Sequence, residues 1–360
     1  MNDDNKLLSI KKTNNQYFDV NIKSKNIKRE YNIGIGLLRI ILSFMVVIDH
    51  FYNKNKLKKY HSFLYYHIPS FFLLSFYFTY KTLISFNIPK IKLRLERIII
   101  PYFSWCILSW IIKNIYSYTF YLTFRYSLKD CIFNLMHGHL VNVVLWFQNI
   151  LILSTFTFLI IIFIFKNNYI LILIILLIIS YILQYSGLNR KFFYKYSTVH
   201  FRLTYGRFIE AIPNAVTGFI FASFQILKKC QQFRKELIFF SLIIIVIITK
   251  YDIFMELKEF KYGGLRLNIA AICIFLFFTL LPFEKVRFRI IIIIIKQISY
   301  YSGGIYFTHY LIGKGFLSKI IYFIKNSSFL GCIKIYIISY LVSFIGEKIF
   351  KKTKFRHLFS

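Results

Sequence analysis

Apolar residues form long continuous stretches along most of this chain, and short polar segments separate them. A helix needs about 20 apolar residues to cross the hydrocarbon of a bilayer, and most of the stretches are close to that length. The stretches do not alternate between apolar and polar residues, so they predict helices and not the strands of a barrel. We therefore expect an all-α polytopic membrane protein with about ten transmembrane helices, at residues 33–52, 63–84, 98–117, 142–165, 168–186, 205–227, 236–250, 265–283, 289–324 (a longer stretch holding one helix) and 328–350.

The polar segments differ in charge, and this difference predicts the orientation of the chain. Lysine and arginine are dense in segments 85–97, 228–235 and 351–360, which share a side with the N-terminus if successive helices alternate in direction. Cytoplasmic loops carry an excess of these two residues, so both termini are expected to be cytoplasmic. The loop at 53–61 contains several lysines and departs from the rule.

One transmembrane domain, residues 32–350, is expected between a polar cytoplasmic tail at 1–31 and a basic cytoplasmic tail at 351–360. The net charge of +33 would suggest a nucleic-acid partner in a soluble protein. Here the basic residues lie between apolar stretches, which indicates a lipid bilayer and no nucleic acid. The five cysteines show no C-x-x-C spacing, so neither a disulfide framework nor a metal site is expected.

The first apolar stretch carries three ionisable side chains, at Arg39, Asp49 and His50. Each such group costs roughly 2.5–3.5 kcal/mol at the centre of a membrane helix, so it rarely persists there without a function. Arg39 and His50 are separated by about three helical turns, so they share one face at a distance of roughly 16 Å. Asp49 points about 100° away from His50. The pair Arg39 and His50 is therefore the first candidate site.

A second candidate is the basic segment after the second stretch, where Arg94 and Arg97 are three residues apart. Residues at this spacing share a helical face, and paired guanidinium groups can hold phosphate bidentately. The alternative is an ordinary cytoplasmic charge cluster that only fixes the topology.

Other ionisable groups have two interpretations each. Glu210 is one of few acids inside an apolar stretch, where it either pairs with Arg207 or faces the same cavity as His50. His309 is either functional or a hydrogen-bonded packing residue. The basic and aromatic loop at 187–204 would hold an anionic or sugar-rich ligand, or lie against lipid headgroups.

Two features have ordinary explanations. Trp146, at the end of a stretch, is typical of an aromatic anchor at the membrane interface. His137 and His139 lack a third ligand nearby, so no metal is expected there.

These motifs, in this order and spacing, resemble the integral-membrane acyltransferase-3 family, whose members transfer acyl groups, often acetyl, to sugars of cell-surface glycans. Arg39 and His50 match its R/K-x10-H signature, and Arg94 and Arg97 match its R-x-x-R motif. Its F-F-x-x-S-G stretch resembles residues 71–76, where Phe76 replaces the glycine. Weaker similarities lie at Leu145–Phe147, Ala211–Gly218 and Ser302–His309.

The resemblance implies a membrane-bound O-acyltransferase, most simply an O-acetyltransferase, of a bacterial inner membrane. The donor would be acetyl-CoA or another acyl-CoA, and the acceptor a sugar hydroxyl of a surface polysaccharide or of its lipid-linked oligosaccharide precursor. Arg94 and Arg97 would bind the phosphates of the donor, and Arg39 would lie near its thioester. His50 suits the base that takes the hydroxyl proton, because histidine is the side chain whose unperturbed pKa, near 6.5, fits that role at neutral pH, and Glu210 would be its orienting carboxylate.

The alternative is a membrane protein of glycan assembly without acyl transfer, such as a polymerase or a flippase. A polymerase would use arginines in an outer loop, and residues 187–204 leave this possibility open. A polyprenyl-phosphosugar glycosyltransferase is expected to carry acids in its first outer loop, whereas residues 53–61 contain none.

Overall fold

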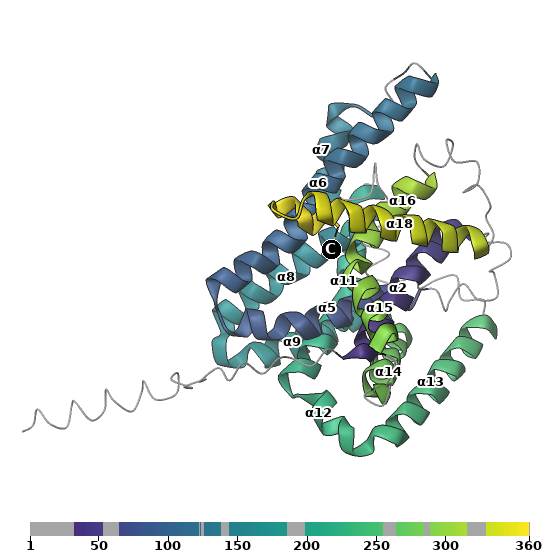
Figure 1. Ribbon diagram of the computed structural model, residues 1–360. Helices are drawn as coiled ribbons and strands as arrows, with labels where there is room; N and C mark the ends of the chain where they lie inside the picture. The colour runs from purple at the N-terminus through teal and green to yellow at the C-terminus, as the bar shows by residue number, and fades with distance from the viewer. Residues whose placement is uncertain are drawn as a thin grey trace, which may run out of the picture. The chain divides into compact units, whose positions relative to one another are not determined.

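The computed structural model describes residues 32–52, 65–121, 123, 126–137, 144–185, 199–254, 264–283, 289–314 and 329–359. The chain divides into two compact units, Met1–Asn32 and Ile33–Ser360, and the second unit contains all the helices below (Figure 1). The described residues form helices and turns, without a strand. The all-α prediction is confirmed for this part of the chain.

The described helices follow one another in chain order. They are α2 (Ile33–Phe51), α5 (His67–Ile84), α6 (Ile88–Tyr121), α7 (Leu128–His137), α8 (Leu145–Phe165), α9 (Tyr169–Tyr185), α11 (Val199–Ser223), α12 (Ile226–Cys230), α13 (Arg234–Phe254), α14 (Leu265–Leu280), α15 (Arg289–Tyr300), α16 (Ser302–Lys314) and α18 (Phe329–Ile349). Short 3₁₀ segments are η1 (Lys166–Asn168), η2 (Gln231–Phe233) and η5 (Lys354–Leu358).

A helix or a helix pair lies at each predicted apolar stretch, but fewer segments qualify as spans by length and apolarity. Within the described residues, four do so: Ile33–Phe51, Ile88–Thr119, Leu145–Tyr185 and Phe329–Ile349. A fifth is added if α15 and α16, which are bent by 61° at Tyr301, count as one. The protein is thus an integral membrane protein by its helices, while the number of about ten spans and the side of the termini stay predictions.

Two local predictions were wrong. Segment 85–97 was expected to be a loop, but residues 88–97 form the first turns of α6. Asn87 caps this helix, because its side-chain Oδ1 accepts a hydrogen bond from the backbone N–H of Lys90 at 3.1 Å. Pro89 is tolerated because its position in the first turn needs no backbone donor.

The stretch from residue 289 was expected to hold one helix, but it holds two. The break at Tyr301 is followed by Ser302, Gly303 and Gly304, which are poor helix formers. The break therefore follows from the sequence, although an apolar count alone does not detect it.

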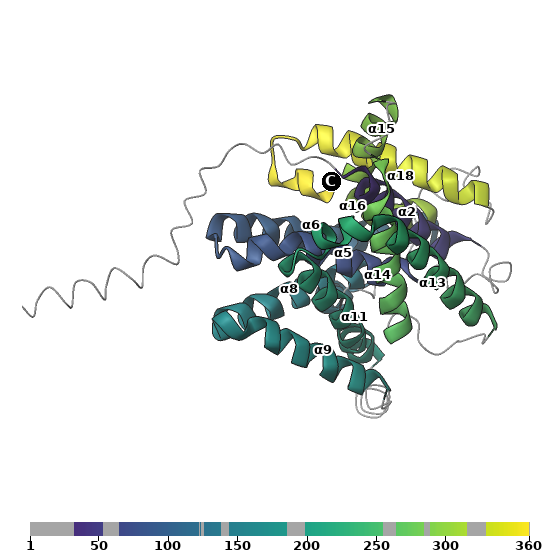
Figure 2. The same cartoon turned by 90° about the horizontal axis from the view of Figure 1, so that it is seen from below.

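The packing that positions the site centres on α2 and α5. α5 packs along α11, where an added Cβ at Gly218 would overlap the carbonyl oxygen of Leu73, so the two backbones are in direct contact. α2 packs against α5, α14, α15, α16 and α18 (Figures 1 and 2). These contacts hold two apolar clusters, one built on Phe72, Phe158 and Phe219 and one on Leu38, Leu73 and Phe275.

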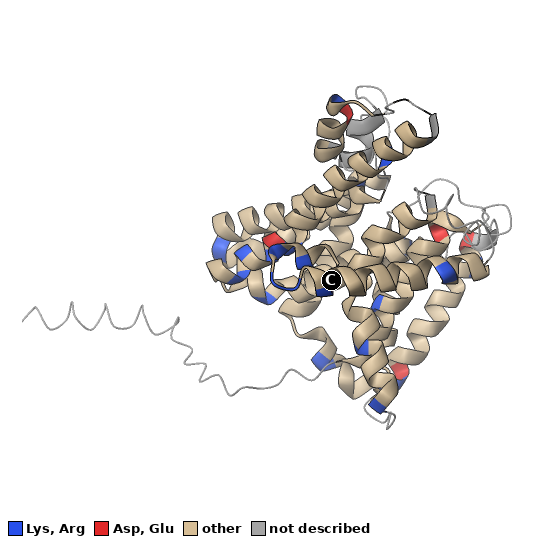
Figure 3. Cartoon of the chain, turned by 45° about the horizontal axis from the view of Figure 1, so that its top comes forward, with Lys and Arg blue, Asp and Glu red and all other residues tan. Residues whose placement is uncertain are grey.

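The segment at 351–360, expected to be a basic cytoplasmic tail, contains η5, which packs on α6, α16 and α18. Basic residues gather around this end of the chain (Figure 3). The side of the membrane that it occupies stays a prediction.

Candidate active site

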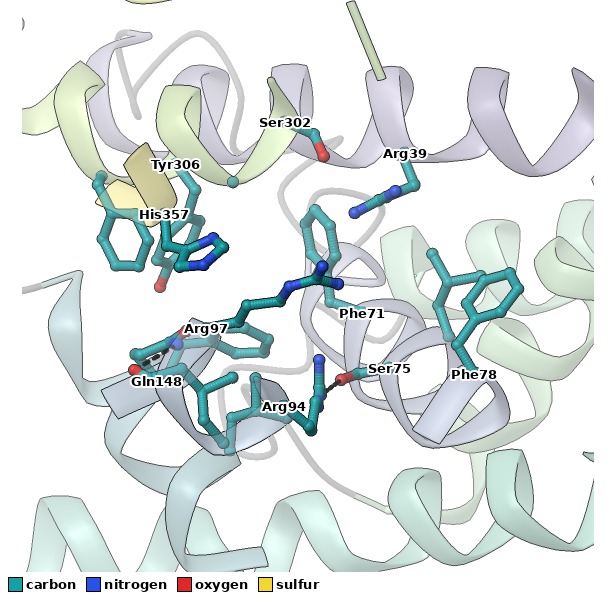
Figure 4. A pocket seen from close by; sticks show the side chains of 16 residues that line it. Arg39, Phe71, Ser75, Phe78, Arg94, Arg97, Gln148, Ser302, Tyr306 and His357 are labelled. Carbon is teal, nitrogen blue, oxygen red and sulfur yellow. Dashed lines mark hydrogen bonds between the residues drawn. The ribbon is translucent and has the colours of Figure 1, made fainter. Parts of the chain in front are cut away.

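A cavity of about 300 Å³ lies where α2, α5, α6, α8, α16 and η5 meet. Its polar lining comes from Arg39, Ser75, Arg94, Arg97, Gln148, Ser302, Tyr306 and His357 (Figure 4). No carboxylate is among the described residues that line it. We call this cavity the arginine pocket.

Three guanidinium groups from two helices converge in the arginine pocket. Arg39 on α2 and Arg97 on α6 point toward each other across the cavity, and Arg94 lies on the wall below them in this view (Figure 4). Like charges repel at short range, so such a cluster is stable only if its charge is neutralised by solvent or by a bound anion. Arginine is the side chain best suited to bind phosphate bidentately. The pocket can therefore hold a polyanion.

Arg94 is the most tightly held of the three. Its Nη2 donates a hydrogen bond of 2.6 Å to Ser75 Oγ on α5. Its Nε is buried and has no hydrogen-bond partner among the described residues. A buried donor without a partner costs about 1–3 kcal/mol, so this N–H is available to a bound acceptor. The sequence prediction that Arg94 and Arg97 share a face is consistent with this geometry.

His50 lies outside the arginine pocket, beside a second histidine. Its ring centroid is 5.3 Å from that of His309 on α16 and 5.8 Å from that of Tyr310. His309 is fully buried, and its Nδ1 lies 3.1 Å from the carbonyl oxygen of Ile305. Because a carbonyl only accepts, Nδ1 carries the proton in the neutral ring, and Nε2 has no partner among the described residues. The sequence leaves the role of His309 open, and the structure places it against His50.

Helices α2 and α16 connect the arginine pocket with the two histidines. They pack against each other, so Arg39 and His50 on α2 run beside Ser302, Tyr306 and His309 on α16. The Tyr306 ring, which lines the pocket, is 6.0 Å from the His309 ring. The two subsites thus lie along one line of contact, about three helical turns apart.

Glu210 and Arg207 lie on α11, away from the lining of the arginine pocket. Glu210 is half-buried. The guanidinium carbon of Arg207 lies 4.1 Å from the ring centre of Trp146, a cation–π contact. Trp146 is buried, so its interpretation as an interfacial anchor was wrong, because an anchor faces headgroups. The proposed role of Glu210 beside His50 stays a prediction.

Some of the candidate site residues lie outside the part of the chain that the structure describes. The loop at 53–61, the histidine pair His137 and His139 and the outer loop at 187–204 lie outside the residues whose side chains are described. In the described part, no group of three His, Cys, Asp or Glu residues is placed to hold a metal ion.

Sequence reasoning missed two residues of the pocket. Gln148 is buried and donates from Nε2 to the carbonyl oxygen of Ile98 at 3.0 Å. A glutamine in an apolar stretch was a detectable signal. His357 had none, because its place in the pocket depends on how the end of the chain folds back.

A family model described as an acyltransferase domain matches residues 32–348, which is most of the chain. The chain belongs to the acyltransferase-3 family. This membership confirms the resemblance found in the motifs, and it favours acyl transfer over a polymerase or flippase without it. The protein is therefore an acyltransferase with membrane-spanning helices. No curated protein and no solved structure matches the chain.

Proposed function

We propose that this acyltransferase transfers an acyl group, most simply acetyl, from acyl-CoA to a sugar hydroxyl of a surface polysaccharide or of its lipid-linked precursor, in a bacterial inner membrane. The observation that carries the proposal is the convergence of Arg39, Arg94 and Arg97 in one pocket, with His50 further along α2. CoA carries several phosphates at one end and the thioester at the other. The arginine pocket contains three arginines, and the contact between α2 and α16 runs from it to His50. This arrangement fits such an elongated donor.

The donor would bind with its phosphates on Arg94 and Arg97. Arg39 lies on the opposite wall. It is the α2 residue among those that line the pocket, and His50 lies further along the same helix. Arg39 would meet the pantetheine arm or the thioester. With both termini cytoplasmic, the arginine pocket would open on the cytoplasmic side, where acyl-CoA is made.

His50 would act as the general base. Its imidazole accepts the proton of the sugar hydroxyl, and the hydroxyl oxygen attacks the thioester carbonyl. The tetrahedral intermediate then collapses, the C–S bond breaks, and the sulfur of CoA leaves with the proton returned by His50. His309 would hold the ring of His50 by packing against it, and Glu210 would be the orienting carboxylate.

The proposal is tested on the surface glycan of a strain that lacks the gene. NMR of the purified glycan is expected to show an O-acyl signal in the parent and none in the deletion strain. Wild-type protein should restore the signal, whereas His50→Ala and Arg39→Ala should not, although both reach the membrane at normal levels. An intact signal in the deletion strain, or its restoration by His50→Ala, would contradict the proposal.

A further inference from the structure

The end of the chain folds back onto the helix that carries Arg94 and Arg97. Lys354 Nζ lies 2.9 Å from Glu96 Oε1, so an ion pair joins η5 to the turn of α6 between the two arginines. Further along α6, Trp105 Nε1 donates a hydrogen bond of 3.2 Å to the carbonyl oxygen of Leu358. The segment is thus attached to α6 at two separate points.

Aromatic packing fixes the last described residue of this segment. The ring of Phe359 stacks on that of Phe350 at 5.7 Å and lies 6.0 Å from that of Trp105, edge to face. A Cβ added at Gly346 of α18 would lie 2.5 Å from the Phe359 ring. Only glycine leaves room for this ring, so the surface of α18 at Gly346 accommodates the end of the chain.

These contacts hold His357 in the lining of the arginine pocket. His357 is 8% exposed, and its ring lies on the side of the pocket formed by Tyr306 and Arg97 (Figure 4). The neighbouring Arg356 is exposed and is not among the lining residues. The family match ends at residue 348, so this wall of the pocket comes from a segment beyond the matched range.

We propose that segment 354–359 is a wall of the donor site and that His357 is a further binding residue for the phosphate groups of the donor. This inference rests on the proposed function, because it takes acyl-CoA as the anion in the pocket. An imidazole at the rim of a triple-arginine pocket donates an N–H to a phosphate oxygen, and it adds a positive charge when it is protonated. It therefore tunes the affinity of a site whose other cations keep a fixed charge.

The surroundings of His357 predict the direction of a pH effect. Burial, followed by the charges of Arg356 and Arg97, lowers the pKa of His357 below its ordinary value of 6.5, and Glu96 partly opposes this. An imidazole with a lowered pKa is neutral near pH 7, whereas a bound phosphate favours the protonated form. Binding takes up a proton, so His357 should strengthen donor binding as the pH falls. The other charged groups around it are Arg39, Arg94, Arg97, Lys354, Arg356 and Glu96.

The test is calorimetric binding of CoA to the full-length protein in detergent at about pH 6 and about pH 8, on either side of the ordinary histidine pKa. His357→Ala is expected to weaken binding about tenfold at the lower pH and less at the higher pH. His357→Gln keeps an N–H donor, so it should bind like the wild type at the higher pH and lose the gain at the lower pH. Lys352→Gln is the matched control, because it removes an exposed charge near η5 and should leave binding unchanged.

Two further variants distinguish a failure of the proposed role of His357 from a failure of the proposed donor site. Gly346→Ala should displace the end of the chain without changing any lining side chain, and its loss of affinity should match that of His357→Ala. Arg97→Ala should abolish CoA binding if the pocket is the donor site. Lost binding in Arg97→Ala with unchanged binding in His357→Ala at both pH values would overturn the role of His357 and leave the donor site intact.

Inorganic pyrophosphate, a minimal polyanion, tests the remaining case, in which the pocket binds phosphate groups but does not bind CoA. Wild-type protein that binds pyrophosphate but not CoA would contradict the proposed donor. The same comparison of wild type with His357→Ala, measured with pyrophosphate, would then decide the role of His357 as a phosphate-binding residue. Wild-type protein that binds neither would contradict both proposals.

Discussion

At the scale of single residues, Arg94 shows how the site holds a charge inside an apolar helix bundle. Its guanidinium is fixed by Ser75 on a neighbouring helix, and its buried Nε–H has no partner in the part of the chain that the structure describes. Hydrogen bonds to charged groups contribute about 1.5–3 kcal/mol, so the serine restricts the arginine to one position. An arginine restrained before the donor arrives binds at a lower entropic cost.

We predict that Ser75→Ala weakens donor binding and leaves the chemical step unchanged. Loss of the hydrogen bond frees Arg94 to move, so the KM for acyl-CoA should rise about tenfold, with kcat within about twofold of wild type. Steady-state transfer measured against donor concentration provides the check. Ser85→Ala, at the exposed end of the same helix, is the control and should change neither constant. A fall in kcat at unchanged KM would show that Ser75 acts in the chemistry instead.

At the scale of elements, the site depends on helices that share a long contact. α6 carries Arg94 and Arg97 on a continuous helix, which fixes their separation. α2 and α16 bring Arg39 and His50 beside Tyr306 and His309. α5 holds Ser75 in place only while it stays against α11.

We predict that Gly218→Ala separates α5 from α11 and destabilises the protein. The added methyl would overlap the Leu73 carbonyl, and forcing extra atoms into a packed contact costs about 1–3 kcal/mol. The melting temperature of the purified protein should fall by several degrees, as measured by fluorescence in detergent. Ala222→Ser, one turn later on the same helix at a half-buried position, should melt like the wild type. Equal melting of Gly218→Ala and wild type would mean that the two backbones are not in contact.

At the scale of the whole molecule, an ion pair with a buried carboxylate joins α13 to α14, which packs against α2 and α5. Asp252 at the end of α13 lies 3.0 Å from Arg266 on α14, and the hydroxyl of Tyr66, just before α5, donates to the same carboxylate at 3.0 Å. The side chain of Asp252 is buried, so the ion pair is a structural contact.

We predict that Asp252→Ala destabilises the protein without changing the kinetics of the folded fraction. Removing Asp252 leaves Arg266, which is 24% exposed, without its partner, and this costs less than the roughly 3–5 kcal/mol of a fully buried pair. The double variant Asp252→Ala/Arg266→Ala should recover part of this loss, and thermal melting of both variants provides the measurement. Equal stability of the single and double variants would show that the two charges do not interact.

The sequence by itself determined the properties that depend on neighbours along the chain. Continuous apolar stretches predicted where helices lie, and helical periodicity put Arg39 with His50 and Arg94 with Arg97 on shared faces. The ordered motifs predicted the family, which the family match confirmed.

Only the tertiary structure decided which of these faces meet. It brought Arg39 to Arg94 and Arg97, placed His309 against His50, and added His357 from the end of the chain. Contacts of this kind join residues that are far apart in sequence. They depend on how helices pack, and small features such as Gly218 and Gly346 decide that packing by allowing close approach.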